Sequence, residues 1–213
     1  MLRGLIVTVM FWIFGILPGA AGGMENAAIA PPSDELEAPA GPAVAAPLGW
    51  LDFCKRYSGE CDDRYLPPAK LDMTAAIWSD LRGTNDLVNR TIEPESDRDH
   101  WGADERWDFP TDGKGDCEDY VLMKRKILMT HGYPRQALLI AVVYRPDDKE
   151  GHAVLMVKTD AGDLVLDNRR DMILQWNDTG YEFLKRQSQE NQNRWVRLGN
   201  PVSTPPAVSA QSP

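Results

Sequence analysis

The stretch GKGDCEDYVLMKRK, residues 113–126, contains the clearest helix start in the chain. Asp116 follows a loop with two glycines and is a good N-cap residue, and acidic residues occupy the turn after it. The segment HGYP, residues 131–134, carries the histidine, glycine and proline that are typical of a helix end. The pattern predicts a helix that begins at Cys117 and ends near residue 131.

Three segments of strand character follow this helix. Residues 137–144, ALLIAVVY, are almost continuously apolar, which is typical of a central strand. The segments HAVLMVKT, 152–159, and LVLDN, 164–168, flank the turn signal DAGD and predict a hairpin. A helix is also predicted upstream, at residues 74–92. Helices followed by an antiparallel sheet indicate an α+β fold.

The remaining segments divide the 213-residue chain. Residues 1–23 combine an early arginine, a short apolar run and small residues, which predicts a signal peptide rather than a membrane anchor. Residues 24–47 are rich in alanine and proline and predict a disordered linker, and residues 199–213 predict a disordered tail. One domain is expected over residues 48–198, with a polar helix and a short aromatic strand in its last part, 181–198.

The charge of the chain narrows the classes of partner. The net charge is −9, and no basic patch is visible in the sequence, which argues against nucleic acid. Acidic residues concentrate in the segment 94–119. This segment is either a solvated acidic loop or a cation site.

Three cysteines in a chain expected to be exported favour one pair and one free thiol. Cys54 and Cys61 enclose a short loop and can close a disulfide, which leaves Cys117. At the first turn of a helix, unpaired N–H groups and the helix dipole favour a thiolate, and they can also receive an oxyanion. Cys117 is therefore a candidate nucleophile, although a buried structural cysteine is the alternative.

A cysteine nucleophile needs a base, and the chain has three histidines. His131 lies at the far end of the predicted helix, about 21 Å from Cys117 at 1.5 Å per residue. His100 lies in the acidic segment with nothing to anchor it. His152 opens a predicted strand and is the best candidate.

An acceptor that orients the imidazole is offered by Asp167, a lone carboxylate in an otherwise apolar strand that needs a partner if it is buried. If Val157 lies opposite Leu164 in the hairpin, Asp167 and His152 are diagonal neighbours on one face of the sheet. A register shifted by one residue would place them on opposite faces.

The chain resembles the bacterial transglutaminase-like cysteine proteinases over roughly residues 51–195. The blocks that carry this likeness are WGADERWDFP (101–110), GDCEDYVLMKRKIL (115–128), GHAVLMVKT (151–159) and GDLVLDN (162–168). The resemblance implies a papain/transglutaminase-like α+β core, in which the helix that bears the cysteine packs on an antiparallel sheet that bears the histidine and the aspartate. It implies a thiol peptidase that cleaves a protein substrate. It also implies that Cys117, His152 and Asp167 are the catalytic residues.

The same resemblance implies calcium beside the nucleophile, with Asp116, Glu118 and Asp119 at the matching positions. Clustered carboxylates suit calcium, but the same three residues can instead cap the helix and complement its dipole. The best-known member of the family acts in the periplasm, cleaves large surface adhesins involved in biofilms, and is controlled by an inner-membrane receptor. The resemblance therefore implies a periplasmic or secreted protein with a surface adhesin as substrate and such a receptor as regulator.

Two other functions are compatible with the sequence. An acyl transferase of the transglutaminase type would use the same three residues, with an amine in place of water. A calcium-dependent binding module without catalysis would keep the fold but would not need the Cys117 thiol.

Overall fold

The structure is a computed structural model that describes residues 36–199 of the chain. The segments predicted as a signal peptide (1–23) and as most of the tail lie outside the described residues. The helices of this part are α2 (Leu48–Arg56), α3 (Ala75–Thr91), α4 (Asp97–Trp101) and α5 (Cys117–Thr130), with the 3-10 helices η1 (Ser58–Glu60), η2 (Arg135–Ala137) and η3 (Trp176–Asp178). Over residues 36–199, no helix is long and apolar enough to cross a membrane.

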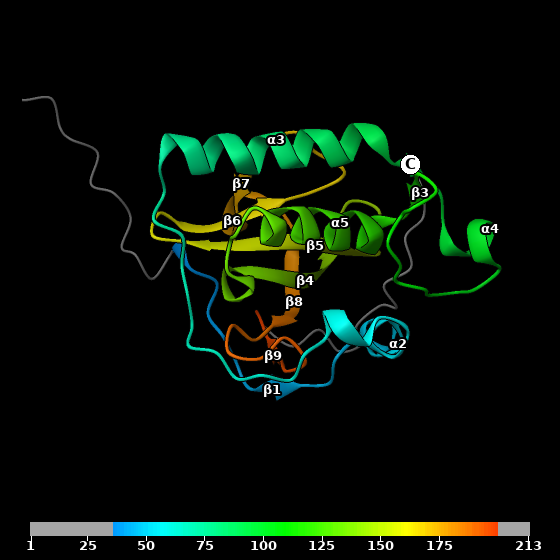
Figure 1. The fold of residues 1–213 in the computed structure, drawn as a ribbon, viewed down its shortest axis with the longest axis horizontal. Helices are drawn as coiled ribbons and strands as arrows, with labels where there is room; N and C mark the ends of the chain where they lie inside the picture. Colours follow the sequence, from blue (N-terminus) through cyan, green and yellow to red (C-terminus); the bar gives the residue numbers. More distant parts are fainter. Residues whose placement is uncertain (1–35, 200–213) are drawn as a thin grey trace, which may run out of the picture. The chain divides into compact units, whose positions relative to one another are not determined.

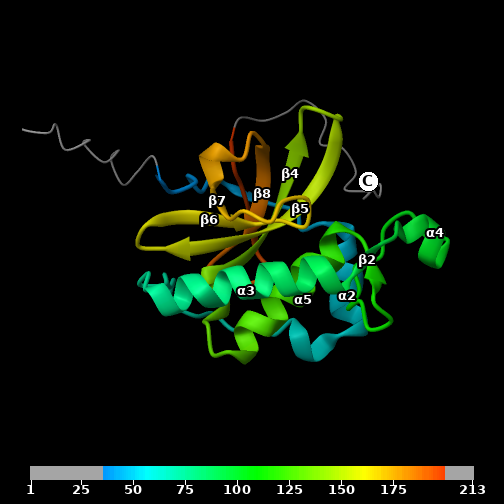
Figure 2. The ribbon, with the colours of Figure 1, turned by 90° about the horizontal axis from the view of Figure 1, so that it is seen from above.

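The described part is built on a seven-stranded antiparallel sheet with the order β1-β9-β8-β4-β5-β6-β7 (Figure 1). Its strands are β1 (Ala43–Val44), β4 (Leu138–Arg145), β5 (Glu150–Thr159), β6 (Gly162–Leu166), β7 (Leu174–Gln175), β8 (Glu182–Gln187) and β9 (Trp195–Arg197). A separate parallel pair joins β2 (Glu93–Pro94) to β3 (Lys114–Gly115). Figure 2 shows α2, α3 and α5 together on one side of the sheet that contains β4, β5 and β6.

Side-chain alternation along β5 divides the core between the two faces of the sheet. Leu155 and Val157 belong to the larger cluster, which also contains Val121 and Leu128 of α5. Met156 belongs to a second cluster with residues of β4, β6 and β8. The α+β prediction, with the Cys117 helix packed on the sheet, is confirmed.

The elements nearest Cys117 agree with the sequence prediction. Helix α5 begins at Cys117, and the backbone N–H of Asp116 donates to the Asp119 carboxylate at 3.3 Å. The β5–β6 hairpin has Val157 opposite Leu164, which is the register that places residues 152 and 167 on one face. The first two cysteines, for which the sequence left a disulfide open, are joined by one.

Two predictions about the other segments were wrong. The polar helix expected within 181–198 is strand β8, whose last two polar side chains, Arg186 and Gln187, are buried and bonded within the fold rather than exposed on a helix. Gln187, for example, is fully buried: its Oε1 accepts from the N–H of Ile140, and its Nε2 donates to the carbonyl of Gln192.

The linker predicted over 24–47 is also ordered in its last part, before residue 48. Ala43 and Val44 form β1, which pairs with β9. The N–H of Ala38 donates to the buried carboxylate of Asp163 at 2.8 Å, so this segment satisfies a polar group of the core. A composition rich in alanine and proline did not reveal these tertiary contacts.

Candidate active site and cation site

The candidate nucleophile lies where helix α5 meets strand β5. Cys117 is 2% exposed and is the first residue of α5. Strand β6, the partner of β5 in the hairpin, ends at Leu166. The N–H of Ala153 in β5 donates to Cys117 Sγ at 3.3 Å. The thiol in turn donates to Glu118 Oε2 at 2.8 Å. The sulfur is thus held between a strand amide and a buried carboxylate.

The candidate base is joined to its acceptor as the hairpin register predicts. His152 Nε2 and Asp167 Oδ1 are 2.8 Å apart, and both side chains are nearly fully buried. The second carboxylate oxygen of Asp167 accepts from the hydroxyl of Tyr181 at 2.6 Å, and the N–H of Arg169 donates to Oδ1 at 3.0 Å. The ring of Tyr181 also packs edge-on against the imidazole, with the ring centroids 5.8 Å apart.

These contacts favour the charged form of the acceptor. Burial alone would raise the pKa of Asp167, but hydrogen bonds from His152 and Tyr181 and the charge of the imidazole outweigh it. The pKa of the Asp167 carboxyl is therefore held well below its usual range. A carboxylate that is ionised at neutral pH can fix one tautomer of the imidazole and stabilise its cation.

The surroundings of the thiol have the opposite effect to those of Asp167, because they disfavour the charged form of the group. Burial raises the pKa of Cys117 well above its ordinary value, and the charges of Glu118 and Asp116 raise it further. The hydrogen bond from Ala153 lowers it only in part. Burial and the neighbouring carboxylates therefore outweigh the hydrogen bond from Ala153, and together they disfavour the thiolate. Over residues 36–199, no hydrogen bond joins the thiol to the imidazole.

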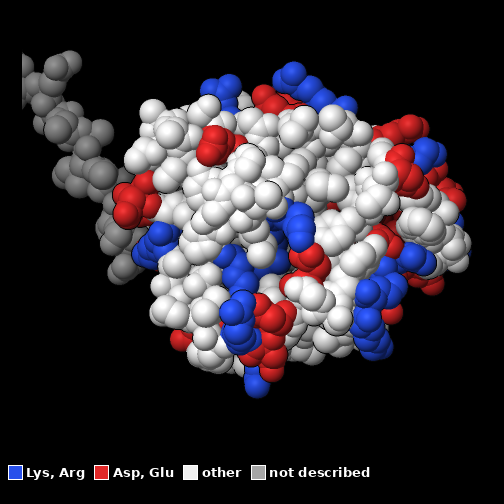
Figure 3. All heavy atoms as spheres, viewed as in Figure 1, with Lys and Arg blue, Asp and Glu red and all other residues white. Residues whose placement is uncertain are grey.

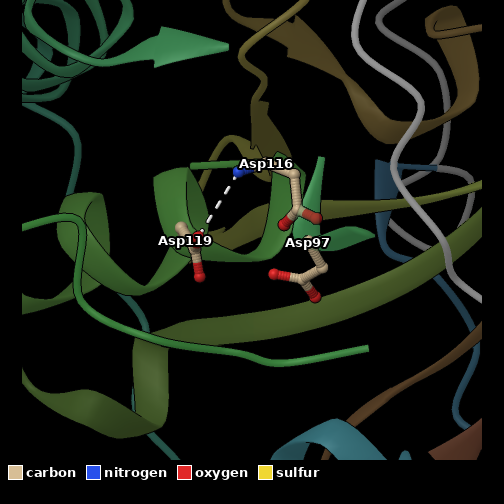
Figure 4. Close-up of side chains that lie close together, drawn as sticks. All are labelled: Asp97, Asp116 and Asp119. Atoms are coloured by element: carbon tan, nitrogen blue, oxygen red, sulfur yellow. Dashed lines mark hydrogen bonds between the residues drawn. The ribbon is translucent and has the colours of Figure 1, made fainter. Parts of the chain in front are cut away.

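Figure 4 shows a buried group of three aspartates, one of which, Asp116, directly precedes Cys117 in the chain. One carboxylate oxygen from each of Asp97, Asp116 and Asp119 lies within 4.8 Å of the other two. All three residues are at most 6% exposed. A side chain at Gly115 would place its Cβ 2.5 Å from Asp119 Oδ2, so only glycine lets the carboxylate lie this close to the backbone.

The three carboxylates fit a hard cation. Burial, followed by the charge of Asp116, raises the pKa of Asp97 to about 7, and the same two causes raise the pKa of Asp119 well above its ordinary value. Asp116 Oδ1 is buried and accepts no hydrogen bond from the described residues. Carboxylates that repel one another in a buried site are the ligands that calcium prefers.

Sequence reasoning found part of this cluster. Asp116 and Asp119, two of the predicted ligands, are in it. Glu118, the third, is outside the cluster, and its carboxylate binds the thiol. Asp97 was missed, although it lies in the acidic segment that suggested a cation site. No spacing signals it, because it is brought beside Asp116 by the two-residue β2–β3 pair, in which Pro94 lies opposite Gly115.

The surface of this part of the molecule carries charges of both signs. On the face in Figure 3, basic side chains lie among acidic ones, and uncharged atoms cover much of the remainder.

Comparison with solved structures supports the fold. The calcium-bound LapG of Legionella pneumophila aligns with a TM-score of 0.50 and 23% identity, over 60% of this chain and 74% of that one. Two other structures of Legionella pneumophila LapG, one of them treated with EGTA, give TM-scores of 0.48 at 25% and 24% identity. They cover 56% and 62% of this chain, and 68% and 72% of the Legionella chains. A comparison with curated proteins found no match.

Comparison with protein families is decisive for the class of protein. The pattern of the family described as bacterial transglutaminase-like cysteine proteinase, BTLCP, matches residues 40–202, which is more than half of the chain. The match includes the Cys117 helix, the β5–β6 hairpin and the aspartate cluster. This chain therefore belongs to the bacterial transglutaminase-like cysteine proteinase family.

Proposed function

We propose that this cysteine proteinase hydrolyses a protein substrate with Cys117 as nucleophile, His152 as acid–base and Asp167 as the residue that orients the imidazole. The observation that carries the proposal is the buried pair of His152 and Asp167, whose Nε2 and Oδ1 atoms are 2.8 Å apart. The residue after His152 in β5, Ala153, donates its N–H to the Cys117 sulfur. Membership of a cysteine proteinase family agrees with this assignment.

In this proposal each group has a separate task. Nε2 of His152 faces Asp167, so Nδ1 is the nitrogen that takes the thiol proton and later donates it to the leaving amine. The Cys117 thiolate adds to the amide carbonyl and forms an acyl-enzyme, which water then hydrolyses. The N–H groups of the first turn of α5 lie beside the sulfur and are suited to stabilise the oxyanion.

We also propose that Asp97, Asp116 and Asp119 hold a calcium ion. The buried cluster of carboxylates with raised pKa values supports this, as does the calcium-bound state of the Legionella protein with the same fold. When bound, a divalent cation supplies positive charge next to the thiol, which offsets the carboxylates that raise the pKa of Cys117. The chain's own residues carry out every step of the reaction.

The proposed place of action is outside the cytoplasm, in the periplasm or beyond. The disulfide between Cys54 and Cys61 supports this, because such bonds persist in oxidising compartments. The signal peptide at 1–23 remains a prediction. A surface adhesin as substrate and a membrane receptor as regulator are likewise predictions, which rest on the resemblance alone.

Digestion of a proteome-derived peptide library tests the proposed function. New amino termini, identified by mass spectrometry, should appear with the wild type and disappear with Cys117→Ala and His152→Ala. A second digestion with added primary amine separates hydrolysis from acyl transfer, since a transferase would give amide adducts in place of free carboxyl termini. Equal products from wild type and Cys117→Ala would exclude thiol catalysis, and a wild type that gives no new amino termini would favour a binding module.

A further inference from the structure

The Cys54–Cys61 disulfide closes a loop that contains Arg56 and Tyr57, and both of these side chains bind Asp108. The disulfide joins the end of α2 to the residue after η1, with the two Cα atoms 5.4 Å apart. We propose that this loop is a clamp in which Arg56 and Tyr57 act as positioning residues for Asp119. The inference rests on the proposed cation site and concerns how the chain builds it.

The first link runs from the loop to Asp108. The hydroxyl of Tyr57 donates to Asp108 Oδ1, and Arg56 Nη1 donates to Oδ2 at 2.8 Å. A second guanidinium nitrogen of Arg56 donates to the carbonyl of Trp107. Asp108 is 6% exposed and the Arg56 side chain is 27% exposed, so these contacts are partly shielded from solvent. Charge-assisted hydrogen bonds of this kind are the strong ones in proteins.

The second link runs from Asp108 to the cation cluster. The backbone N–H of Asp108 donates to Asp119 Oδ1 at 2.7 Å. The other oxygen of Asp119 accepts from the N–H of Asp116. Asp119 lies in the first turn of α5, two residues after Cys117. The Asp108 amide therefore makes the shorter of the two backbone hydrogen bonds that orient the Asp119 carboxylate.

Aromatic packing and a hydrogen bond hold the disulfide loop in the position from which it binds Asp108. The ring of Tyr57 packs against Phe53 and Phe109, with centroid distances of 4.8 and 5.3 Å. Asn193 binds the disulfide end of the loop through its Nδ2, which donates to the carbonyl of Cys61 at 3.1 Å. Opening the disulfide would leave this short loop with more conformations and the Asp108 contacts less favourable. Groups that orient metal ligands commonly change metal affinity by about 10–100-fold when they are removed.

Calorimetric titration of the purified protein with calcium tests the clamp directly. Tyr57→Phe keeps the ring and its packing but loses the hydroxyl, and Cys54→Ser combined with Cys61→Ser opens the loop. Tyr133→Phe is the matched control, because its hydroxyl also donates to an aspartate, Asp80, at 2.6 Å, near the opposite end of α5. The melting temperature of each variant is measured in chelator alongside the titration.

The calcium affinity should fall several-fold in Tyr57→Phe and by about tenfold or more in the double serine variant, and it should be unchanged in Tyr133→Phe. A variant of the loop that melts lower but binds calcium as the wild type does would show a purely structural role and overturn the inference. Wild-type calcium binding with no loss in Tyr57→Phe would also overturn it, while leaving the proposed cation site intact. A wild type that binds no calcium would overturn both.

Discussion

The two ends of the candidate active site are built in opposite ways. At the base end, the Asp167 carboxylate accepts hydrogen bonds from His152, Tyr181 and the Arg169 amide, and its pKa is held low. At the nucleophile end, the thiol donates to Glu118, and burial and nearby carboxylates raise its pKa. At the base end, the protein's own groups therefore provide every partner that the His152–Asp167 pair needs. The nucleophile end, in contrast, gathers buried carboxylates around the thiol.

This difference assigns separate tasks to the two halves of the fold. The β5–β6 hairpin positions the base by register, which depends on pairing within the chain. The start of α5 places a thiol among acids, an arrangement that suits catalysis only if a cation offsets them. The comparison predicts that changes at the base end act independently of calcium and that changes at the nucleophile end act through it.

Removal of either reacting group should have the largest effect. Cys117→Ala and His152→Ala should each lower kcat/KM by at least about 10³-fold, because nucleophile and base act as one unit. The double variant should be little worse than either single variant. Peptide cleavage at saturating calcium measures all three, and additive losses would show that the two residues do not act together.

Loss of a proposed calcium ligand should have the next largest effect. Asp97→Asn is expected to weaken calcium binding by about 10–100-fold, and activity at high calcium should largely return. Asp104→Asn is the control, because this aspartate is exposed and lies in the same acidic segment. Calorimetry and cleavage at several calcium concentrations measure the effect, and equal affinities in the two variants would remove Asp97 from the site.

Stability without calcium should depend on pH. The carboxyls of Asp97 and Glu105 have folded pKa values of about 7, raised by burial, whereas those in an unfolded chain titrate near 4. Between these values the folded protein binds more protons than the unfolded one, so the free energy of unfolding falls as the pH rises. In chelator, the melting temperature should be at least about 3 °C lower at pH 7.5 than at pH 5.5, equivalent to roughly 1 kcal/mol.

Saturating calcium should abolish or reverse this dependence, because it binds the ionised carboxylates. Asp97→Asn should reduce it in chelator, since the substituted side chain does not titrate. A melting temperature in chelator that rises between pH 5.5 and 7.5 would contradict the raised pKa values at the nucleophile end.

The smallest effect is expected from Tyr181→Phe, which removes one hydrogen bond from Asp167. The value of kcat should fall by a few-fold to about tenfold, with KM nearly unchanged, since a hydrogen bond to a charged group contributes about 1.5–3 kcal/mol and only part of that reaches the imidazole. The same loss should appear at every calcium concentration. Tyr65→Phe, which loses a hydroxyl bonded to Glu190 on the surface, is the control. A loss that extra calcium restores would contradict the separation of the two ends.

The sequence could predict those parts of the site that depend on local pattern. The capping residue Asp116 fixes the helix start at Cys117, and the two-residue period of the hairpin fixes His152 and Asp167 on one face. The contribution of Asp97 could not be predicted, because it depends on a short parallel pair between segments about 20 residues apart. Strand β8 was mistaken for a helix for the related reason that its polar groups find partners only in the folded sheet.

The most direct test of the two-ended account is the rate of Cys117 alkylation by iodoacetamide as a function of pH, with calcium or with chelator. Because Cys54 and Cys61 are paired, Cys117 is the one free thiol among the three cysteines, and its modification is followed by mass spectrometry. We expect calcium to shift the profile to lower pH and to raise the rate at pH 7 by at least about tenfold, equivalent to one pKa unit. Identical profiles with calcium and with chelator would contradict the claim that a cation completes the nucleophile end.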